Sequence, residues 1–95
     1  MQNDRFEWDD AKAASNLAKH GVSFEDACAV FDDPSAIGEA DPGVHREVRL
    51  RTIGSTGSRV LFVVSTEVDD DVTRIISARR ATRHEEDRYY RQASY

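Results

Sequence analysis

The sequence predicts an α+β fold, with a small antiparallel sheet that follows two helices and precedes a third. Apolar residues recur with a helical period over residues 10–31, and strand-like patterns replace that period over residues 48–78. A charged segment from residue 83 again fits a helix, and short polar turns separate the expected strands. With 95 residues the chain is long enough for one compact domain, residues 1–95.

The first elements are a short strand and a helix. Phe6 and Trp8 alternate with a polar residue, which indicates a strand with one buried face. Asp9 is a typical N-cap, the alanine-rich residues 10–20 favour a helix, and Gly21 is a typical C-cap.

A second helix is expected to begin at Ser23 and to end before Pro34. Its apolar stripe has i, i+3, i+4, i+7 spacing and comprises Phe24, Ala27, Cys28 and Phe31. Cys28 is therefore expected to be a buried, unreactive thiol. As the only cysteine it excludes an internal disulfide, which favours a reducing compartment and a cytoplasmic protein.

Three strands are expected in the second half. Residues 48–53 alternate between the two faces, and the continuous apolar run of residues 60–65 predicts a central strand covered on both faces. Residues 72–78 form the third strand, and residues 37–40 are a candidate edge strand.

The closing helix is predicted from about Arg83, because Thr82 and Glu85 have the spacing of a capping box. Of its two adjacent tyrosines, Tyr89 and Tyr90, one ring is expected to pack on the sheet and the other to face a partner.

Composition excludes a membrane span, since no apolar run approaches 18 residues, and the N-terminus lacks the pattern of a secretory signal. The net charge of -5 argues at first against nucleic acid, but residues 48–95 hold nine basic and seven acidic side chains. Arginines outnumber lysines by eleven to two. That bias fits phosphate or carboxylate recognition, although a GC-rich codon bias explains it equally well.

Three groups of residues are candidates for chemistry. On the first helix, Lys12, Asn16 and His20 share one face, with Lys19 beside them, and the alternative is a plain solvated face. Glu67 ends the central strand on the same face as Leu61 and Val63, and the alternative is a first solvent contact.

The third group is Arg79 and Arg80 at the end of the last strand, where they should point to opposite faces. The alternative is that charged residues simply terminate the strand. No metal site is expected, because the three histidines lack ligand spacing and no cysteine cluster accompanies them. No cofactor is expected either, because "GSTGSR" lacks the lysine and helix of a phosphate-binding loop.

Several segments match the pattern of one protein family in order: "FEWD" at residues 6–9, "KHGVSFEDA" at 19–27, "VV.TE" at 63–67 and "RIISARRAT" at 74–82. On these segments the chain resembles the BrnT toxins of BrnT/BrnA type II toxin-antitoxin systems, which have a RelE-like fold. Lys12, Asn16, Arg49 and a terminal helix that ends in tyrosines also match. Two positions depart from the family pattern: Ser65 replaces a frequent aromatic residue or histidine, and Val68 replaces a frequent basic residue.

The resemblance implies a compact α+β domain whose sheet face cleaves RNA and which a small BrnA-like antitoxin neutralises. Metal-independent RNA cleavage needs a general base, a general acid and positive charge on the transition state. The catalytic candidates are Arg79, Glu67 and His20, and the substrate-binding candidates are Lys12, Lys19, Arg49 and Arg80. An unpaired strand edge would also permit a homodimer or the addition of an antitoxin segment.

One rival function is retained, and a second is disfavoured. The acidic composition is consistent with a non-catalytic, toxin-like module that binds an antitoxin and tunes operon repression. A direct DNA-binding regulator would need a basic recognition helix, and neither the first nor the last helix has one.

Overall fold

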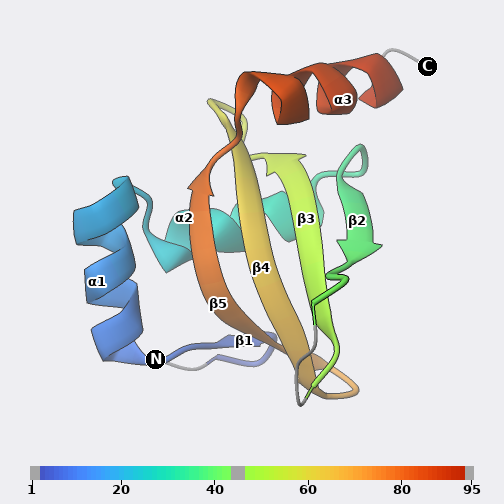
Figure 1. Cartoon of the computed structure of the whole chain (residues 1–95). Coiled ribbons are helices and arrows are strands. Elements are labelled where there is room, and N and C mark those ends of the chain that lie inside the picture. The colour runs from blue at the N-terminus through green and yellow to red at the C-terminus, as the bar shows by residue number, and fades with distance from the viewer. Residues whose placement is uncertain (1–2, 44–46, 94–95) are drawn as a thin grey trace.

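The computed structural model describes residues 3–43 and 47–93, and within them the chain forms a five-stranded sheet with three α-helices (Figure 1). The elements are β1 (Phe6–Glu7), α1 (Asp10–His20), α2 (Phe24–Ala29), η1 (Val30–Asp32), β2 (Ile37–Ala40), β3 (Arg49–Ser55), β4 (Val60–Asp69), β5 (Val72–Arg80) and α3 (Arg83–Ala93). The strand order across the sheet is β1-β5-β4-β3-β2. This arrangement confirms the predicted α+β class.

The sheet is mixed rather than purely antiparallel, which corrects one detail of the prediction. β2, β3, β4 and β5 form an antiparallel meander, but β1 pairs with β5 in parallel, Phe6 opposite Thr73 and Glu7 opposite Arg74. The pattern of residues 6–8 showed that a strand was present but contained no information about its neighbour.

Local capping sets the bounds of α1 as predicted. The Asp9 side chain accepts a hydrogen bond from the Lys12 N–H at 3.0 Å. Gly21 ends the helix with φ 69°, in the left-handed region that suits glycine, and its N–H donates to the Leu17 carbonyl at 2.8 Å. The second helix begins at the Ser23 cap but is shorter than expected, because the chain tightens into the 3₁₀ turn η1 after Ala29.

The buried core lies between the sheet and the two N-terminal helices. Phe24, Leu61 and Val63 have no exposed surface, and Trp8 packs edge-on against Phe24 with ring centroids 5.9 Å apart. Gly54 of β3 permits a close approach here, since a Cβ at that position would lie 2.7 Å from Cγ1 of Val30.

Asn16 fastens α1 along the outer edge of β5. Its side-chain amide donates to the carbonyl of Ala78 at 2.8 Å and accepts from the Ala78 N–H at 3.2 Å. A third bond runs to the Val22 carbonyl at 3.0 Å. Asn16 therefore satisfies backbone groups in the part of β5 that β1 does not reach, and its place in the first candidate group has a structural explanation.

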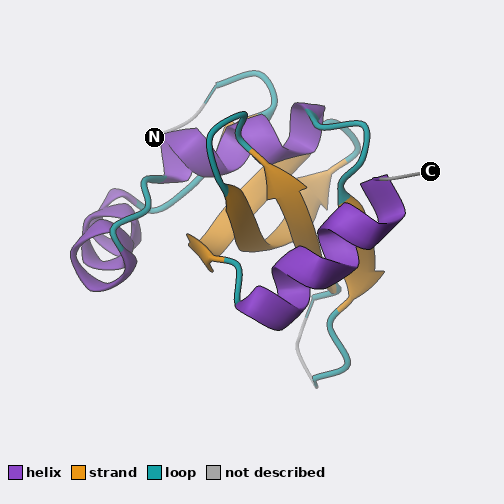
Figure 2. Ribbon diagram, turned by 90° about the horizontal axis from the view of Figure 1, so that it is seen from above, coloured by secondary structure: helices purple, strands orange, loops and turns teal. Residues whose placement is uncertain are grey.

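The opposite face of the sheet is open over most of its area. Figure 1 shows α2 behind the strands, and Figure 2 shows α3 on the other side of the sheet, crossing only its upper end. Phe62 and Val64 of β4 are consequently half-buried. The prediction that the run 60–65 is covered on both faces is therefore wrong, although β4 is central in the sheet.

The closing helix α3 begins with a capping box and buries one of its two adjacent tyrosines. The Thr82 hydroxyl accepts from the Glu85 N–H at 3.2 Å and the Glu85 carboxylate accepts from the Thr82 N–H at 2.8 Å, which confirms the capping box. Tyr89 is 7% exposed and Tyr90 is 54% exposed, so one ring is buried and the other is exposed, as expected. That Tyr90 contacts a partner stays a prediction. In the described residues no helix has the length and apolar character needed to cross a membrane.

Candidate functional site

The open sheet face presents its side chains in three rows across neighbouring strands. The upper row comprises Ile53, Phe62 and Arg79, the middle row Arg51, Val64 and Ser77, and the lower row Arg49, Thr66 and Arg74. Rows that are two residues apart along a strand are separated by roughly 7 Å. Four arginines, one or more in each row, therefore share one solvent-facing surface.

A β-bulge in β5 brings Arg74 to this surface. Residues 74 and 79 are an odd number of positions apart and would point to opposite faces of a regular strand. In the ladder between β4 and β5, Val64 pairs with Ser77 and Ser65 pairs with Ile75, so Ile76 is an extra residue. Arg74 was not among the site residues predicted from the sequence, and regular alternation would place it on the face opposite to Arg79.

Arg79 lies at the upper end of the open sheet face, stacked over an aromatic ring. Its guanidinium carbon is 4.1 Å from the centroid of the Phe62 ring. Nη1 and Nη2 donate to the two carboxylate oxygens of Glu85 at 2.8 and 3.0 Å, and Nη1 also donates to the Arg80 carbonyl at 3.1 Å. The bonds from Arg79 lower the pKa of the Glu85 carboxyl, although partial burial acts in the opposite direction.

Glu39 of the edge strand β2 extends the middle row of the face, where it lies between two arginines. One of its carboxylate oxygens accepts from Arg51 at 3.2 Å, and the other accepts from Arg88 of α3 at 3.4 Å. This carboxylate therefore connects the edge strand to the closing helix.

The lower end of the open sheet face is hollowed. A hollow of about 480 Å³, here called the lower hollow, contains three of the predicted residues, Lys12, Arg49 and Glu67. Arg74 also lines it, 3.8 Å from Glu7, and Arg49 contacts Glu47 at 3.2 Å. The lower hollow thus places two arginines and a lysine among three carboxylates, those of Asp9, Glu47 and Glu67.

The two departures from the expected family pattern fall in different places. Ser65 is fully buried on the helix-covered face, so it does not line the open sheet face. Val68 lines the lower hollow and is 49% exposed, so a basic residue there would have added charge to the hollow.

The remaining predicted residues lie away from the lower hollow. Lys19 and His20 end α1, one turn beyond the point where Asn16 bonds to Ala78, so they stand beside the upper end of β5. Arg80 pairs with Leu61 while Arg79 pairs with Phe62, which puts the two arginines on opposite faces. Among the described residues, no hydrogen bond or ion pair joins His20 to Arg79.

Glu67 and Arg79 are not brought together. Glu67 lies five residues along β4 from Phe62, the partner of Arg79, which corresponds to about 17 Å of strand. By alternation along β4, the Glu67 side chain also belongs to the face of the sheet opposite to that of Arg79. The predicted residues therefore form two groups, one at the upper end of β5 and one in the lower hollow.

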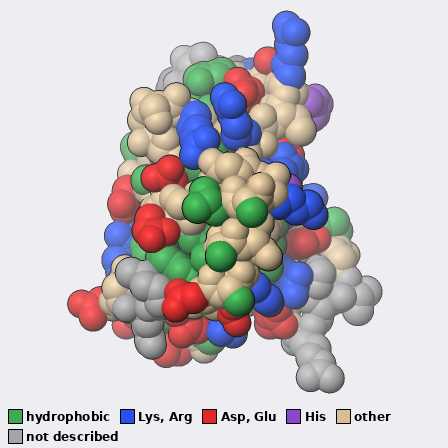
Figure 3. Space-filling model, turned by 90° about the vertical axis from the view of Figure 1, so that its left-hand side faces the viewer, with side chains coloured by type: hydrophobic (Ala, Val, Ile, Leu, Met, Phe, Trp, Pro, Cys, Tyr) green, Lys and Arg blue, Asp and Glu red, His purple; other side chains and the backbone are tan. Residues whose placement is uncertain are grey.

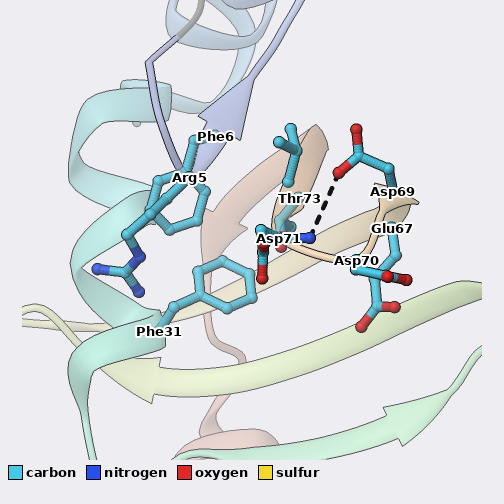
Figure 4. Close-up of a pocket in the computed structure, with 9 residues that line it drawn as sticks. Arg5, Phe6, Phe31, Glu67, Asp69, Asp70, Asp71 and Thr73 are labelled. Atoms are coloured by element: carbon cyan, nitrogen blue, oxygen red, sulfur yellow. Dashed lines mark hydrogen bonds between the residues drawn. The ribbon is translucent and has the colours of Figure 1, made fainter.

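A separate hollow under the β4–β5 turn is strongly acidic. Figure 4 shows Glu67, Asp69, Asp70 and Asp71 around it, with Phe6, Phe31 and Arg5 on the other side. The Asp71 N–H bonds to the Asp69 side chain at 3.3 Å. In the part of the chain that the structure describes, no three acidic, histidine or cysteine side chains are grouped to hold a metal ion.

The charged side chains divide between regions of the surface. Viewed from the side of α1, Figure 3 shows Lys and Arg mainly above and to the right, and Asp and Glu mainly to the left and below. The right-hand edge of that view is the side of the open sheet face.

Cys28 is half-buried, and burial raises the pKa of its thiol to about 11, so it stays protonated at neutral pH.

Comparison with known proteins now defines the class. The family model for the ribonuclease toxin BrnT of type II toxin-antitoxin systems matches residues 8–85, which include all seven predicted site residues. The match places the chain among the ribonuclease toxins of type II toxin-antitoxin systems.

A solved structure supports the same conclusion. The protein in the 1.1 Å crystal structure of the Brucella abortus ribonuclease toxin BrnT is 28% identical in sequence to this chain, with a TM-score of 0.64. The alignment spans 85% of this chain and 100% of the Brucella chain. A search of curated proteins gives no match. The chain belongs to the BrnT family.

Proposed function

We propose that this protein is a metal-independent endoribonuclease that binds RNA across its open sheet face. The observation that supports the proposal is the distribution of arginines over all three rows of that face. Arginine holds a phosphate through two parallel N–H donors, and a strand of RNA presents one phosphate after another along its length. A flat face with cations spaced along it suits such a ligand.

The reaction proceeds by internal displacement. A general base removes the proton of a ribose 2′-hydroxyl, the 2′-oxygen bonds to the adjacent phosphorus, and the bond from phosphorus to the 5′-oxygen breaks. A general acid gives a proton to that 5′-oxygen, which leaves a 2′,3′-cyclic phosphate. Negative charge grows on the non-bridging oxygens, and a positioned guanidinium stabilises it.

The two groups of predicted residues receive different roles. Arg79 binds the phosphate that is cleaved, with proton transfer by His20 and added positive charge from Lys19 and Arg80 at the same end of β5. The lower hollow binds the flanking backbone through Lys12, Arg49 and Arg74, and there Glu67 accepts a hydrogen bond from a sugar hydroxyl. A second position of cleavage, in the lower hollow with Glu67 as the base, is the alternative within this proposal.

The test compares three forms of the protein on RNA in the presence of EDTA. Wild type is expected to degrade RNA, and Arg79→Ala is expected to lower the rate about 10²- to 10³-fold, as removal of a transition-state donor does. Arg5→Ala is the matched control, because Arg5 lies away from the open sheet face in an exposed pair with Asp32. Cleavage by Arg79→Ala at the wild-type rate would refute the role of Arg79.

Parallel variants locate the cleavage. Glu67→Gln is expected to retain turnover and to raise KM, while His20→Gln is expected to lower kcat. The reverse pattern, with kcat lost in Glu67→Gln and only KM raised in Arg79→Ala, would move the chemistry to the lower hollow.

One observation favours the non-catalytic alternative. Arg49, Arg51, Arg74 and Arg79 each contact a carboxylate, so RNA must compete with or add to existing ion pairs. Absence of cleavage in three assays, one in EDTA, one with a divalent cation and one with ribosomes, would establish that alternative.

We further propose that the protein acts in the cytoplasm. We also propose that a BrnA-like antitoxin or a second copy pairs with the free edge of β2, which co-purification of the co-expressed proteins would test.

A further inference from the structure

We propose that Glu85 is a positioning residue that fixes the guanidinium of Arg79 for phosphate binding. The inference rests on the proposed function, because it assigns Glu85 a role only through Arg79. Four observations support it: the edge of the guanidinium that Glu85 occupies, the stack on Phe62, the relative burial of the two side chains, and the second bond that holds Glu85 in place.

Glu85 occupies one edge of the guanidinium and leaves another for a ligand. The bonds to Glu85 use Nη1 and Nη2, and the bond to the Arg80 carbonyl uses the second proton of Nη1. None of the hydrogen bonds among the described residues uses Nε of Arg79 or the second Nη2 proton. These two donors form a side-on fork that can hold a phosphate while Glu85 stays bound.

Both the plane of the guanidinium and its orientation within that plane are fixed. Arg79 stacks over Phe62 at 4.1 Å, and the bidentate carboxylate prevents rotation within that plane. A flexible arginine would have to lose side-chain entropy when RNA binds. Here that ordering is already present before the ligand arrives.

Relative burial indicates that Glu85 lies behind Arg79 rather than in front of it. The Glu85 side chain is 15% exposed, whereas that of Arg79 is 34% exposed. A phosphate that approaches from solvent therefore meets the arginine with less obstruction than a surface ion pair would give. The carboxylate lowers the net charge of the pair but does not cover it.

The capping box holds Glu85 at the start of α3. The same carboxylate oxygen that binds Nη1 of Arg79 also accepts the Thr82 N–H at 2.8 Å. The first turn of α3 is thus tied to the last residues of β5 through a single side chain. Glu85 therefore has two separable tasks, capping the helix and orienting the arginine.

Two substitutions separate these tasks. Glu85→Gln keeps an acceptor at the capping position, where glutamine also serves, but removes the charged bidentate partner of Arg79. Thr82→Ala removes the hydroxyl that accepts from the Glu85 N–H and leaves the Arg79–Glu85 contact intact. Thermal melting of both variants verifies that each is folded before kinetics are compared.

Steady-state cleavage of a defined RNA oligonucleotide gives the result. Glu85→Gln is expected to lower kcat on the order of 10- to 100-fold with a smaller change in KM, since a misplaced catalytic group costs about that much. Thr82→Ala is expected to retain the wild-type kcat.

The rival role for Glu85 is competition, in which it must leave before phosphate binds. A Glu85→Gln variant with kcat equal to or above wild type would overturn the positioning role in favour of competition or of simple capping. Absence of RNA cleavage by the wild-type protein in EDTA would instead refute the proposed function itself, so the two failures are distinguishable.

Discussion

At the scale of single residues, the site depends on positions that alternation along a strand does not reveal. Arg74 faces the same way as Arg79 only because Ile76 is an extra residue in β5. A one-residue irregularity reverses the side on which every later residue of that strand points. The arginine pair at positions 79 and 80 could be assigned to opposite faces from the sequence because no bulge intervenes between them.

Substitution of Arg74 tests the contribution of the lower hollow. Arg74→Ala is expected to raise KM for RNA with little change in kcat, because the side chain would contact a flanking phosphate. Loss of one phosphate contact should also reduce the slope of log binding constant against log salt by about 0.7 to 1. The measurement is KM between 50 and 200 mM salt, as in standard counterion analysis. An unchanged KM and slope, equal to those of Arg5→Ala, would exclude Arg74 from the interface.

At the scale of secondary-structure elements, α3 is fastened to the rest of the fold by a buried tyrosine. The Tyr89 hydroxyl donates to the Asp33 carboxylate at 2.6 Å, and the same carboxylate accepts from the backbone N–H groups of Ser55 and Ser35. This cluster joins α3 to β3 and to the segment after η1. Together with the Arg79–Glu85 pair it holds the helix over the upper end of the sheet.

The Asp33–Tyr89 bond predicts a dependence of stability on pH. Burial acts to raise the pKa of Asp33, but the bonds from Tyr89, Ser55 and Ser35 outweigh it and lower the pKa below 3.8. The resulting stability is present above pH 3.8 and is lost as the pH falls through the folded pKa. The bond to Asp33 raises the pKa of Tyr89 from 10.0 to about 12, so its contribution is lost between those values as the pH rises.

Tyr89→Phe removes the bond and provides the measurement. At pH 7 the variant is expected to lose about 1 kcal/mol of unfolding free energy in urea, the typical net value of one hydrogen bond. The difference from wild type should shrink as the pH falls through the pKa of Asp33, and again as the pH rises from 10.0 towards about 12. A difference that stays constant across this range would show that the lost hydroxyl acts through packing alone.

The same scale shows how far sequence patterns determine this fold. Caps and periods predicted α1, the start of α2 and the start of α3, because these signals are local and involve contacts within one turn. The parallel pairing of β1 and the open side of β4 were not predictable in this way. Both depend on which distant segment packs against a strand, which the apolar content of residues 60–65 does not specify.

At the scale of the whole molecule, an acidic protein can still present a face suited to phosphate. The net charge is -5, yet the open sheet face carries four arginines while four carboxylates gather under the β4–β5 turn. The acidic composition therefore does not exclude phosphate binding, but each of the four arginines contacts a carboxylate, so a phosphate must use the donors that these ion pairs leave open. Of the four arginines on the open sheet face, Arg49 and Arg79 were predicted from the sequence as site residues, but Arg51 and Arg74 were not. Only the strand register shows that the predicted site residues form two groups rather than one.

The central claim, that RNA lies across the open sheet face, is tested most directly by titrating the isotopically labelled protein with a 2′-deoxy oligonucleotide and following its NMR signals. Such a ligand lacks the attacking hydroxyl and cannot be cleaved. The predicted result is a set of chemical-shift changes at the Arg79 Nε–H and at the backbone amides of Val64, Thr66 and Arg74. Changes confined to α2 and the outer surface around Asp26, with the open sheet face unaffected, would contradict the claim.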